Sequence, residues 1–265
     1  MKLIDTHCHL AHSRLRPQLQ AVLERARAAG VTAVVCAAGD LGESHAAAGI
    51  ARLAGDVHFM AGVHPHEAKS VPDDYLRQVE QLAGQPKCAG VGEIGLDYHH
   101  NFSPPARQRL IFAEQLALAA RLQAKIVVHT REAFDDTMSI LADSRVDGSG
   151  IVFHSFTEGP ACVRRALDCG ASVSFSGIVT FSGAGEVHQS ARLVPVDRLL
   201  VETDAPYLSP EPVRRMKTNE PANVAHVAAF LAELRGLSPD ELAETTTANA
   251  VRFFGLPVDR GQAGS

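Results

Sequence analysis

The stretch Leu3-Ile4-Asp5-Thr6-His7-Cys8-His9 decides the fold, because it joins a short apolar segment directly to two histidines. Residues 2–5 are typical of a first β-strand. His7 and His9 are two residues apart, and such residues point to the same side of an extended chain, whereas Cys8 should point into the packing behind them. Two imidazoles on one side at a strand's C-terminal end form half of a metal site. Alone, the pair fits ordinary polar loop residues equally well.

Segments that predict strands and helices alternate along the chain. Strands are expected at 2–5, 32–37, 58–63, 87–91, 125–128, 151–153, 171–175 and 198–202, and helices at 15–29, 43–54, 73–82, 105–122, 133–142, 159–168 and 185–193. Strands that are apolar throughout are buried on both faces, as a parallel sheet requires. Eight strands in one repeated strand–helix order, in 265 residues, predict a closed (β/α)8 TIM barrel rather than an open sheet.

The region after the eighth strand predicts two more helices, at 223–234 and 238–253. No linker or second core separates them from the barrel, so we expect a single domain at 1–259 with a C-terminal helical extension. The glycine-rich tail at 260–265 is expected to be disordered.

Composition and charge argue against a strongly basic protein, a disulfide-rich protein and a membrane-spanning protein. The net charge of −5 provides no global basic field, so a polyanion would have to be held by a local basic patch or by bound cations. The five cysteines form no CxxC pair, and we expect reduced, mostly buried thiols in a cytoplasmic protein. No apolar run reaches membrane-spanning length and no signal-peptide region precedes the first strand, so we expect a protein that is not bound to a membrane. We also expect a monomer.

Histidines and carboxylates recur where the expected strands end. They are His7 and His9, His64, Glu93, His129, His154 and Asp204. The C-terminal ends of barrel strands converge on one face, where TIM-barrel active sites lie. A lone histidine at a strand end is more often a capped polar residue, but so many at equivalent positions indicate a metal site.

The number of these residues favours more than one metal ion. Even without His64, four imidazoles and two carboxylates exceed what one tetrahedral ion with an open position needs. They suit two divalent ions about 3.5–4 Å apart with a carboxylate between them. Glu93 is the best candidate for that bridge, since it lies midway round the expected barrel between the His7/His9 side and the His129/His154 side. Mixed nitrogen and oxygen ligands suit Zn, Mn, Fe or Co, and Mg less readily.

Ten motifs together resemble one family, the TatD-type metal-dependent deoxyribonucleases, over nearly the whole chain. They are, in order, DTHCHL (5–10), GVHPH (62–66), GEIGLDY (92–98), ARQRLIFAEQLAL (106–118), VVHTREA (127–133), VFHSF (152–156), SFSGIVTF (174–181), LVETDAPYL (200–208), NEPANV (219–224) and TTTANAVRFF (245–254). This family is a TIM-barrel branch of the amidohydrolase-like hydrolases. A single HxH pair would not be specific, but this set of motifs is.

The resemblance implies metal-dependent hydrolysis of phosphodiester bonds in DNA, often as a 3′→5′ exonuclease acting on single strands or 3′ ends, with roles in DNA degradation or repair. It implies one ion held by His7, His9, Glu93 and Asp204, a second held by Glu93, His129 and His154, and a phosphate contact at His64. Zn²⁺, Mn²⁺ or Mg²⁺ would serve as the metal.

The chain departs from the family pattern at three places. An extra residue enters the basic loop Pro212–Pro221, which puts the placement of Arg214, Arg215 and Lys217 in question, although we keep Arg214 and Lys217 as expected substrate contacts. Ser155 stands where the family usually has a cysteine. His99-His100-Asn101 replaces a more aromatic stretch. None of these positions is among the ligands that the resemblance implies.

The expected catalytic residues are Asp204, which would take a proton from the attacking water, and the bridging Glu93. Glu202 lies two residues before Asp204, and we expect it to orient a ligand histidine rather than to act in catalysis. Arg131 suits a bidentate phosphate contact as well as it suits a surface salt bridge.

Two other functions fit the same residues. The first is hydrolysis of an ester or amide in a small acyl substrate or an aminoacyl-tRNA, which the basic loop and His64 disfavour without excluding. The second is a non-catalytic metal-binding scaffold, which should lack a ligand or Asp204, and the sequence lacks neither.

Overall fold

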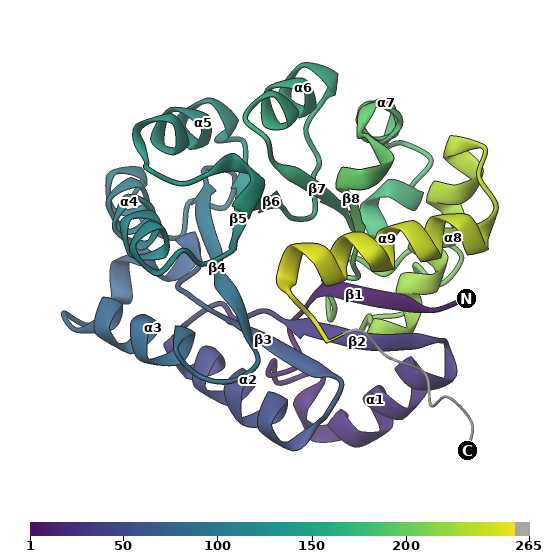
Figure 1. The fold of residues 1–265 in the computed structure, drawn as a ribbon, viewed down its shortest axis with the longest axis horizontal. Coiled ribbons are helices and arrows are strands. Elements are labelled where there is room, and N and C mark those ends of the chain that lie inside the picture. The colour runs from purple at the N-terminus through teal and green to yellow at the C-terminus, as the bar shows by residue number, and fades with distance from the viewer. Residues whose placement is uncertain (258–265) are drawn as a thin grey trace.

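Eight parallel strands ring the centre of the molecule and helices surround them (Figure 1), in a computed structural model that describes residues 1–257. The strands are β1 (Leu3–Cys8), β2 (Val31–Cys36), β3 (Val57–Ala61), β4 (Cys88–Asp97), β5 (Ile126–Arg131), β6 (Ile151–Phe153), β7 (Ser172–Phe175) and β8 (Leu199–Val201). The helices are α1 (Leu19–Ala28), α2 (Leu41–Leu53), α3 (Tyr75–Ala83), α4 (Pro105–Leu122), α5 (Phe134–Asp143), α6 (Pro160–Asp168), α7 (Gly185–Leu193), α8 (Val224–Arg235) and α9 (Pro239–Phe254).

The ring closes between its last and first strands. Neighbours pair in chain order from β1 to β8, and every pair is parallel. At the junction, Asp204 N donates to His7 O at 2.9 Å and His9 N donates to Ala205 O at 2.7 Å. These two bonds complete the predicted TIM barrel and place the segment after β8 beside the end of β1.

Two apolar layers hold the barrel together. Side chains that point outward from the strands, such as Phe59 and Phe153, pack under the surrounding helices in the larger core. Side chains that point inward, such as Met60, form a second cluster that includes Phe253 and Phe254 of α9. Helix α9 crosses the end of the barrel that faces the viewer in Figure 1. One end of the barrel is therefore closed by apolar packing, and the opposite end remains for a site.

The central strands run further than expected. β4 ends at Asp97 rather than at 91, and β5 at Arg131 rather than at 128, because Ile94–Asp97 pair with Val128–Arg131. Glu93 therefore lies inside β4 rather than after it, and His7 likewise lies inside β1.

Three smaller expectations need correction or lie beyond the structure. Helix α1 begins at Leu19 rather than at 15, because the Pro17 segment forms a separate 3-10 turn, Arg16–Gln18. All five cysteines are free and Cys8 is buried as expected, but Cys169 is exposed, since it caps α6 at the surface. The expected tail at 260–265 lies outside the described residues.

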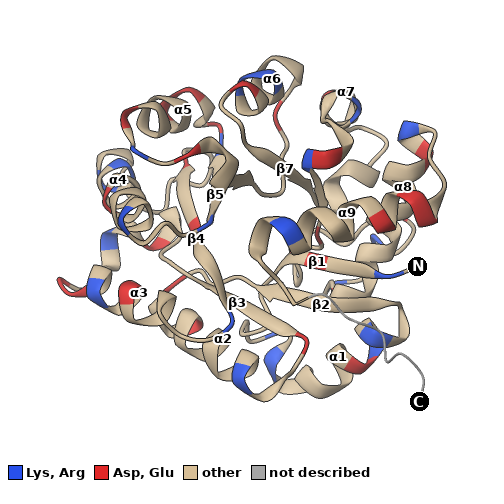
Figure 2. Cartoon of the chain, viewed as in Figure 1, with Lys and Arg blue, Asp and Glu red and all other residues tan. Residues whose placement is uncertain are grey.

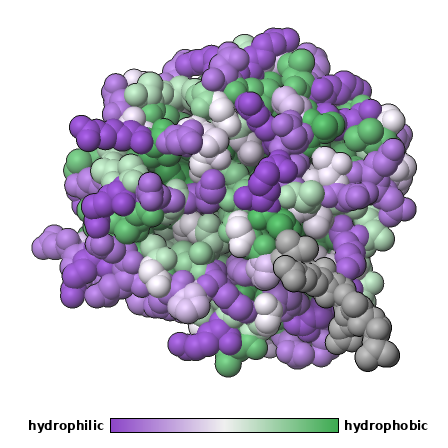
Figure 3. Space-filling model, viewed as in Figure 1, coloured by the Kyte–Doolittle hydropathy of each residue, from purple (hydrophilic) through white to green (hydrophobic). Residues whose placement is uncertain are grey.

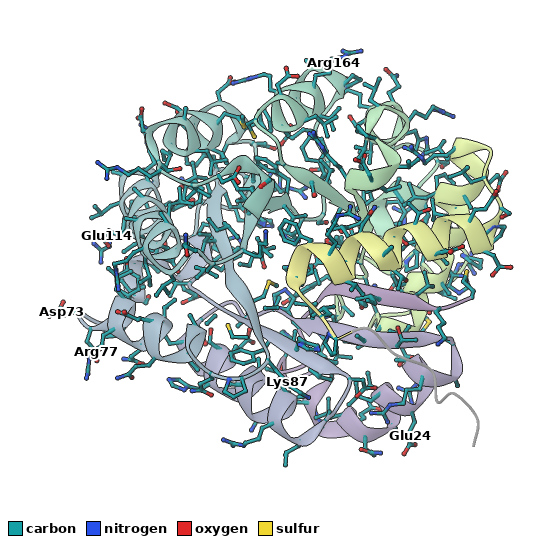
Figure 4. The ribbon with its side chains drawn as sticks, in the orientation of Figure 1. Glu24, Asp73, Arg77, Lys87, Glu114 and Arg164 are labelled. Carbon is teal, nitrogen blue, oxygen red and sulfur yellow. The ribbon has the colours of Figure 1, made fainter. Side chains whose placement is uncertain are left out.

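Charged residues of both signs are interspersed on the outer helices (Figure 2). Glu24, Asp73, Arg77 and Arg164 lie at the periphery in Figure 4. The face in Figure 3, over which α9 passes, alternates hydrophilic and hydrophobic residues. Among the described helices, none is long and apolar enough to cross a membrane.

Replacing Gly95 tests how closely β4 must approach β5. Gly95 has φ +146°, and an added Cβ would lie 1.9 Å from His129 O. We expect Gly95→Ala to lower the free energy of unfolding by about 3 kcal/mol or more, among the larger effects of single substitutions. Urea unfolding followed by circular dichroism would measure this.

Gly49→Ala provides the matched control. Gly49 lies within α2, and nothing lies within 4 Å of the position of its added Cβ. Alanine should therefore stabilise the helix by about 0.5–1 kcal/mol. Equal effects of the two substitutions would contradict the strand-contact explanation.

Candidate metal centre

The open end of the barrel holds a pocket of about 710 Å³. The predicted residues that line it are His9, His64, Glu93, His129, Arg131, His154 and Asp204. His7 lies below this surface and is fully buried. The structure therefore brings all six expected ligands to one place, as the convergence of the strand ends requires.

One oxygen of Glu93 faces the histidines from β5 and β6. Glu93 Oε1 lies 2.7 Å from His154 Nε2 and 2.8 Å from His129 Nδ1. The same oxygen lies 3.3 Å from His64 Nε2. Glu93 is 3% exposed, so this carboxylate is almost shielded from water.

The other oxygen of Glu93 faces the histidines of β1. Glu93 Oε2 lies 3.2 Å from His7 Nε2 and 3.6 Å from His9 Nε2. Asp204 Oδ1 completes this side, at 3.8 Å from His7 Nε2 and 3.5 Å from His9 Nε2. Each oxygen of Glu93 thus serves a separate group of nitrogen atoms, which is the geometry of a carboxylate placed between two sites.

Histidines keep Glu93 ionised in this buried position. Burial by itself would raise the pKa of Glu93, but its electrostatic interactions with His154, His64 and His7 and its hydrogen bond with His129 outweigh burial and hold the pKa well below its usual range. Asp204 behaves similarly. Burial by itself would raise its pKa, but the hydrogen bond from His9 and the electrostatic interactions with His7 and His154 outweigh burial and lower the pKa below its usual value. Both carboxylates are therefore available as negative ligands at neutral pH.

Two buried carboxylates fix the orientation of the histidines. Glu202 Oε1 lies 3.2 Å from His154 Nδ1 and accepts the Ser155 N–H at 2.7 Å. Asp97 Oδ2 lies 3.2 Å from His129 Nε2. A carboxylate on one ring nitrogen holds the proton there, so the lone pair of the other nitrogen points toward Glu93. Glu202 thus contacts a histidine in the way expected from the sequence.

The ring of His7 shows that the residues fit a metal ion. Both ring nitrogens of this buried histidine lack a hydrogen-bond partner among residues 1–257, although Nε2 is close to Glu93 and Asp204. An unsatisfied buried polar atom is costly and needs an explanation. A cation that accepts the His7 lone pair and joins the neighbouring carboxylates satisfies this set of nitrogen and oxygen donors.

His64 differs from the other histidines of the pocket. Its Nδ1 accepts the His66 N–H at 3.1 Å, so its Nε2 carries the hydrogen and points toward Glu93. Burial lowers the pKa of His64 to about 4, which leaves the ring neutral at pH 7. This tautomer offers a hydrogen-bond donor to the pocket rather than a metal ligand.

The basic loop lies outside the main pocket. Arg214 and Lys217 line a neighbouring hollow of about 370 Å³, together with Arg14 and Tyr207. The Arg214 guanidinium lies over the Phe181 ring at 3.9 Å. The structure therefore does not bring these two expected contacts to the metal centre, because the loop after β8 carries them past its edge.

Sequence reasoning missed several residues that line the pocket or its edge. Asp97, His66 and His100 form a second cluster on the pocket wall. Tyr207 lines both the pocket and the neighbouring hollow, and Arg14 lies over its ring at 4.9 Å. The two histidines of His64-Pro65-His66 and the carboxylate of Asp97 at the end of β4 are sequence signals from which this cluster could have been found. No local pattern marks Arg14, whose position depends on the closure of the barrel.

Comparisons with known proteins agree with this centre. The family described as TatD related DNase matches residues 4–255. The uncharacterized metal-dependent hydrolase YcfH of Escherichia coli (strain K12) is 38% identical over 270 residues, which cover 99% of each chain. The 3′-5′ ssDNA/RNA exonuclease TatD of Klebsiella pneumoniae (strain 342) is 35% identical, covering 97% of this chain and 99% of that protein.

Solved structures agree as well. The TatD homolog YJJV from Escherichia coli K12 superposes with a TM-score of 0.90 at 28% identity, and the match covers 96% of this chain and 98% of that one. The chain therefore belongs to the TatD-related DNase family. It is a metal-dependent hydrolase of that family.

Glu202 offers a test of how His154 is held. Glu202→Ala removes the oxygen that His154 Nδ1 and the Ser155 N–H share. We expect Zn²⁺ affinity to fall by about 10–100-fold, the usual effect of losing such a partner. Isothermal titration of the metal-stripped protein would measure it. Glu202→Gln keeps an acceptor oxygen and should lose less, so equal losses in both variants would refute this role.

Proposed function

We propose that the protein is a nuclease that hydrolyses phosphodiester bonds of single-stranded DNA from the 3′ end with two divalent metal ions. His7, His9, Glu93 and Asp204 would hold one ion, and Glu93, His129 and His154 the other. The observation that carries the proposal is the division of Glu93, whose two oxygens face different histidine pairs at 2.7–2.8 Å and 3.2–3.6 Å. Zn²⁺, Mn²⁺ or Mg²⁺ would occupy these positions.

Bound divalent ions would supply Lewis-acid polarisation of the phosphate and a lowered pKa of water. The chain's own groups supply the rest. Asp204 is ionised, lies at the pocket surface and accepts the proton of the attacking water. His64 Nε2–H and the Arg131 guanidinium provide hydrogen-bond donors for the phosphate oxygens from the pocket wall.

The single-stranded nucleic acid would leave the pocket over the loop that follows β8. Tyr207 is 40% exposed and separates the pocket from the hollow that Arg14, Arg214 and Lys217 line. Aromatic rings stack with bases and cationic side chains follow the phosphates in proteins that bind single strands. Because the chain carries a net charge of −5, such local contacts would replace long-range attraction.

The reaction is tested with oligonucleotides labelled at the 3′ or the 5′ end. With Mn²⁺ or Mg²⁺, a 5′-labelled single strand should give a ladder of products shortened from the 3′ end. Asp204→Asn should lower turnover by roughly 10²-fold or more, the scale of general acid–base catalysis. Its circular dichroism spectrum should match wild type, because no β8 residue changes. Cleavage of acyl esters without cleavage of oligonucleotides would overturn the proposal.

The shared role of Glu93 is tested by counting metal ions. Elemental analysis of Glu93→Ala should show two fewer ions per chain than wild type, because both groups of ligands lose an oxygen. His129→Ala should lose about one, since its Nδ1 faces Oε1 of Glu93 and not Oε2. A Glu93→Ala protein with the full metal content of wild type would rule out the bridge.

Substitution of Tyr207 tests whether the single-stranded nucleic acid follows this route. Stacking of one base on an aromatic ring contributes about 1–3 kcal/mol, so Tyr207→Ala should weaken binding of a single-stranded oligonucleotide by about 5–150-fold. Fluorescence anisotropy with Ca²⁺ in place of the active metal would give the Kd. Tyr207→Phe keeps the ring and should bind like wild type. If alanine binds as tightly as phenylalanine, the strand follows another route.

A further inference from the structure

A second group of metal-type side chains lies on the pocket wall beside the centre described above. His66 belongs to the 3-10 turn after β3 (Pro65–Ser70), Asp97 ends β4, and His100 lies in the turn that follows. Asp97 Oδ2 is 2.8 Å from His66 Nε2 and 2.9 Å from His100 Nδ1. The three donor atoms all lie within 4.8 Å of one another.

The surrounding backbone holds this group in place. Buried Gln108 bonds both backbone groups of Asp97, accepting from its N–H at 2.8 Å and donating to its carbonyl at 3.0 Å. Ser103 Oγ donates to the His66 carbonyl at 2.7 Å. The His100 N–H donates to Asp97 Oδ1 at 2.8 Å. The arrangement is thus positioned before any ligand arrives, which lowers the entropic cost of binding one.

The carboxylate of Asp97 lacks a permanent positive partner. Its side chain is fully buried, and every hydrogen bond that it accepts within residues 1–257 comes from a histidine. A buried carboxylate is stable only when its charge is well compensated, and no lysine or arginine pairs with this one among residues 1–257. A divalent cation would compensate it, because neutral imidazoles are ligands for such ions.

We propose that His66, Asp97 and His100 bind a further divalent transition-metal ion, separate from the ions assigned to the Glu93 centre. Two imidazoles and one carboxylate suit Zn²⁺ or Co²⁺, and such a set leaves coordination positions free. All three residues line the pocket, so those positions face the space that a substrate would occupy. Water or a phosphate oxygen of the substrate would complete the coordination there.

Phe102 limits the exposure of this site. Its ring lies 4.7 Å from the ring of His66 and 5.4 Å from the ring of His100. An apolar ring against two ligands reduces the access of water, which strengthens electrostatic contacts within the site. His129 Nε2 approaches the same Asp97 oxygen at 3.2 Å, so the proposed site adjoins the Glu93 centre without sharing its ligands.

The site is tested by counting Co²⁺ ions on the metal-stripped, full-length protein with native mass spectrometry and isothermal titration. His100→Ala should bind one Co²⁺ fewer than wild type. This side chain is 42% exposed and does not touch Glu93, so its loss should leave the fold and the other centre intact. His99→Ala is the matched control, because His99 is the adjacent exposed histidine and pairs with Glu132 at 2.7 Å.

A second pair of variants separates this proposal from the proposed function. Glu93→Ala should retain one Co²⁺, and the double variant Glu93→Ala/His100→Ala should retain none. This count does not depend on whether the protein cleaves oligonucleotides. Equal Co²⁺ stoichiometry and affinity in His100→Ala and His99→Ala would overturn the proposal, as would a Glu93→Ala protein that binds no Co²⁺.

Discussion

The ionised carboxylate of Glu93, buried where the strands converge, is the constraint on which the rest of the structure depends. It is 3% exposed, and five histidines from the ends of β1, β3, β5 and β6 surround it. A buried charge is tolerated only if its partners are positioned accurately, and removing one partner leaves the others uncompensated. The register of several strands is therefore tied to one side chain.

The strands can meet this requirement because their backbones approach closely. Gly92 precedes Glu93, and an added Cβ there would lie 2.8 Å from Val127 Cβ of β5. Gly62, after β3, allows a similarly close approach to Gly92, with backbone atoms 3.0 Å from its added Cβ. These glycines bring the Glu93 backbone close to β5, which carries His129. At the other end of the barrel, α9 fills the opening with Phe253 and Phe254, so access is confined to the metal centre.

The carboxylates around the pocket occupy two kinds of position. Glu93 and Asp204 face the centre, whereas Glu202 and Asp97 stand behind His154 and His129 and determine which ring nitrogen is free. An excess of negative charge at the centre suits cations and repels a polyanion, so metal ions change the sign of the local field as well as supplying chemistry. The cations Arg14, Arg214 and Lys217 line a hollow beyond the edge of that centre, on the path that the proposed function gives to a nucleic-acid strand.

Local sequence patterns predicted the class of fold and the residues of the candidate metal centre. Apolar runs alternating with amphipathic segments predicted eight strands and a closed barrel, and the structure has both. The histidines and carboxylates at strand ends were found without a structure, because every strand of a parallel barrel delivers its C-terminal end to the same face. Where strands end was less predictable: β4 runs through Glu93 to Asp97 because it pairs with β5, and pairing partners cannot be read from one strand.

Only the tertiary structure decided which residues are neighbours across the barrel. The division of Glu93 between two histidine pairs, the contact of Asp97 with three histidines and the placing of Arg14 against Tyr207 all join segments that are remote in sequence. The basic loop was expected to supply substrate contacts and lies beside the centre, since the chain direction after β8 depends on packing rather than on composition. Sequence by itself thus determined the fold and the types of side chain at the candidate centre, because periodicity and residue chemistry are local. The distances and the free ring nitrogens that make these residues a site come from long-range closure of the ring.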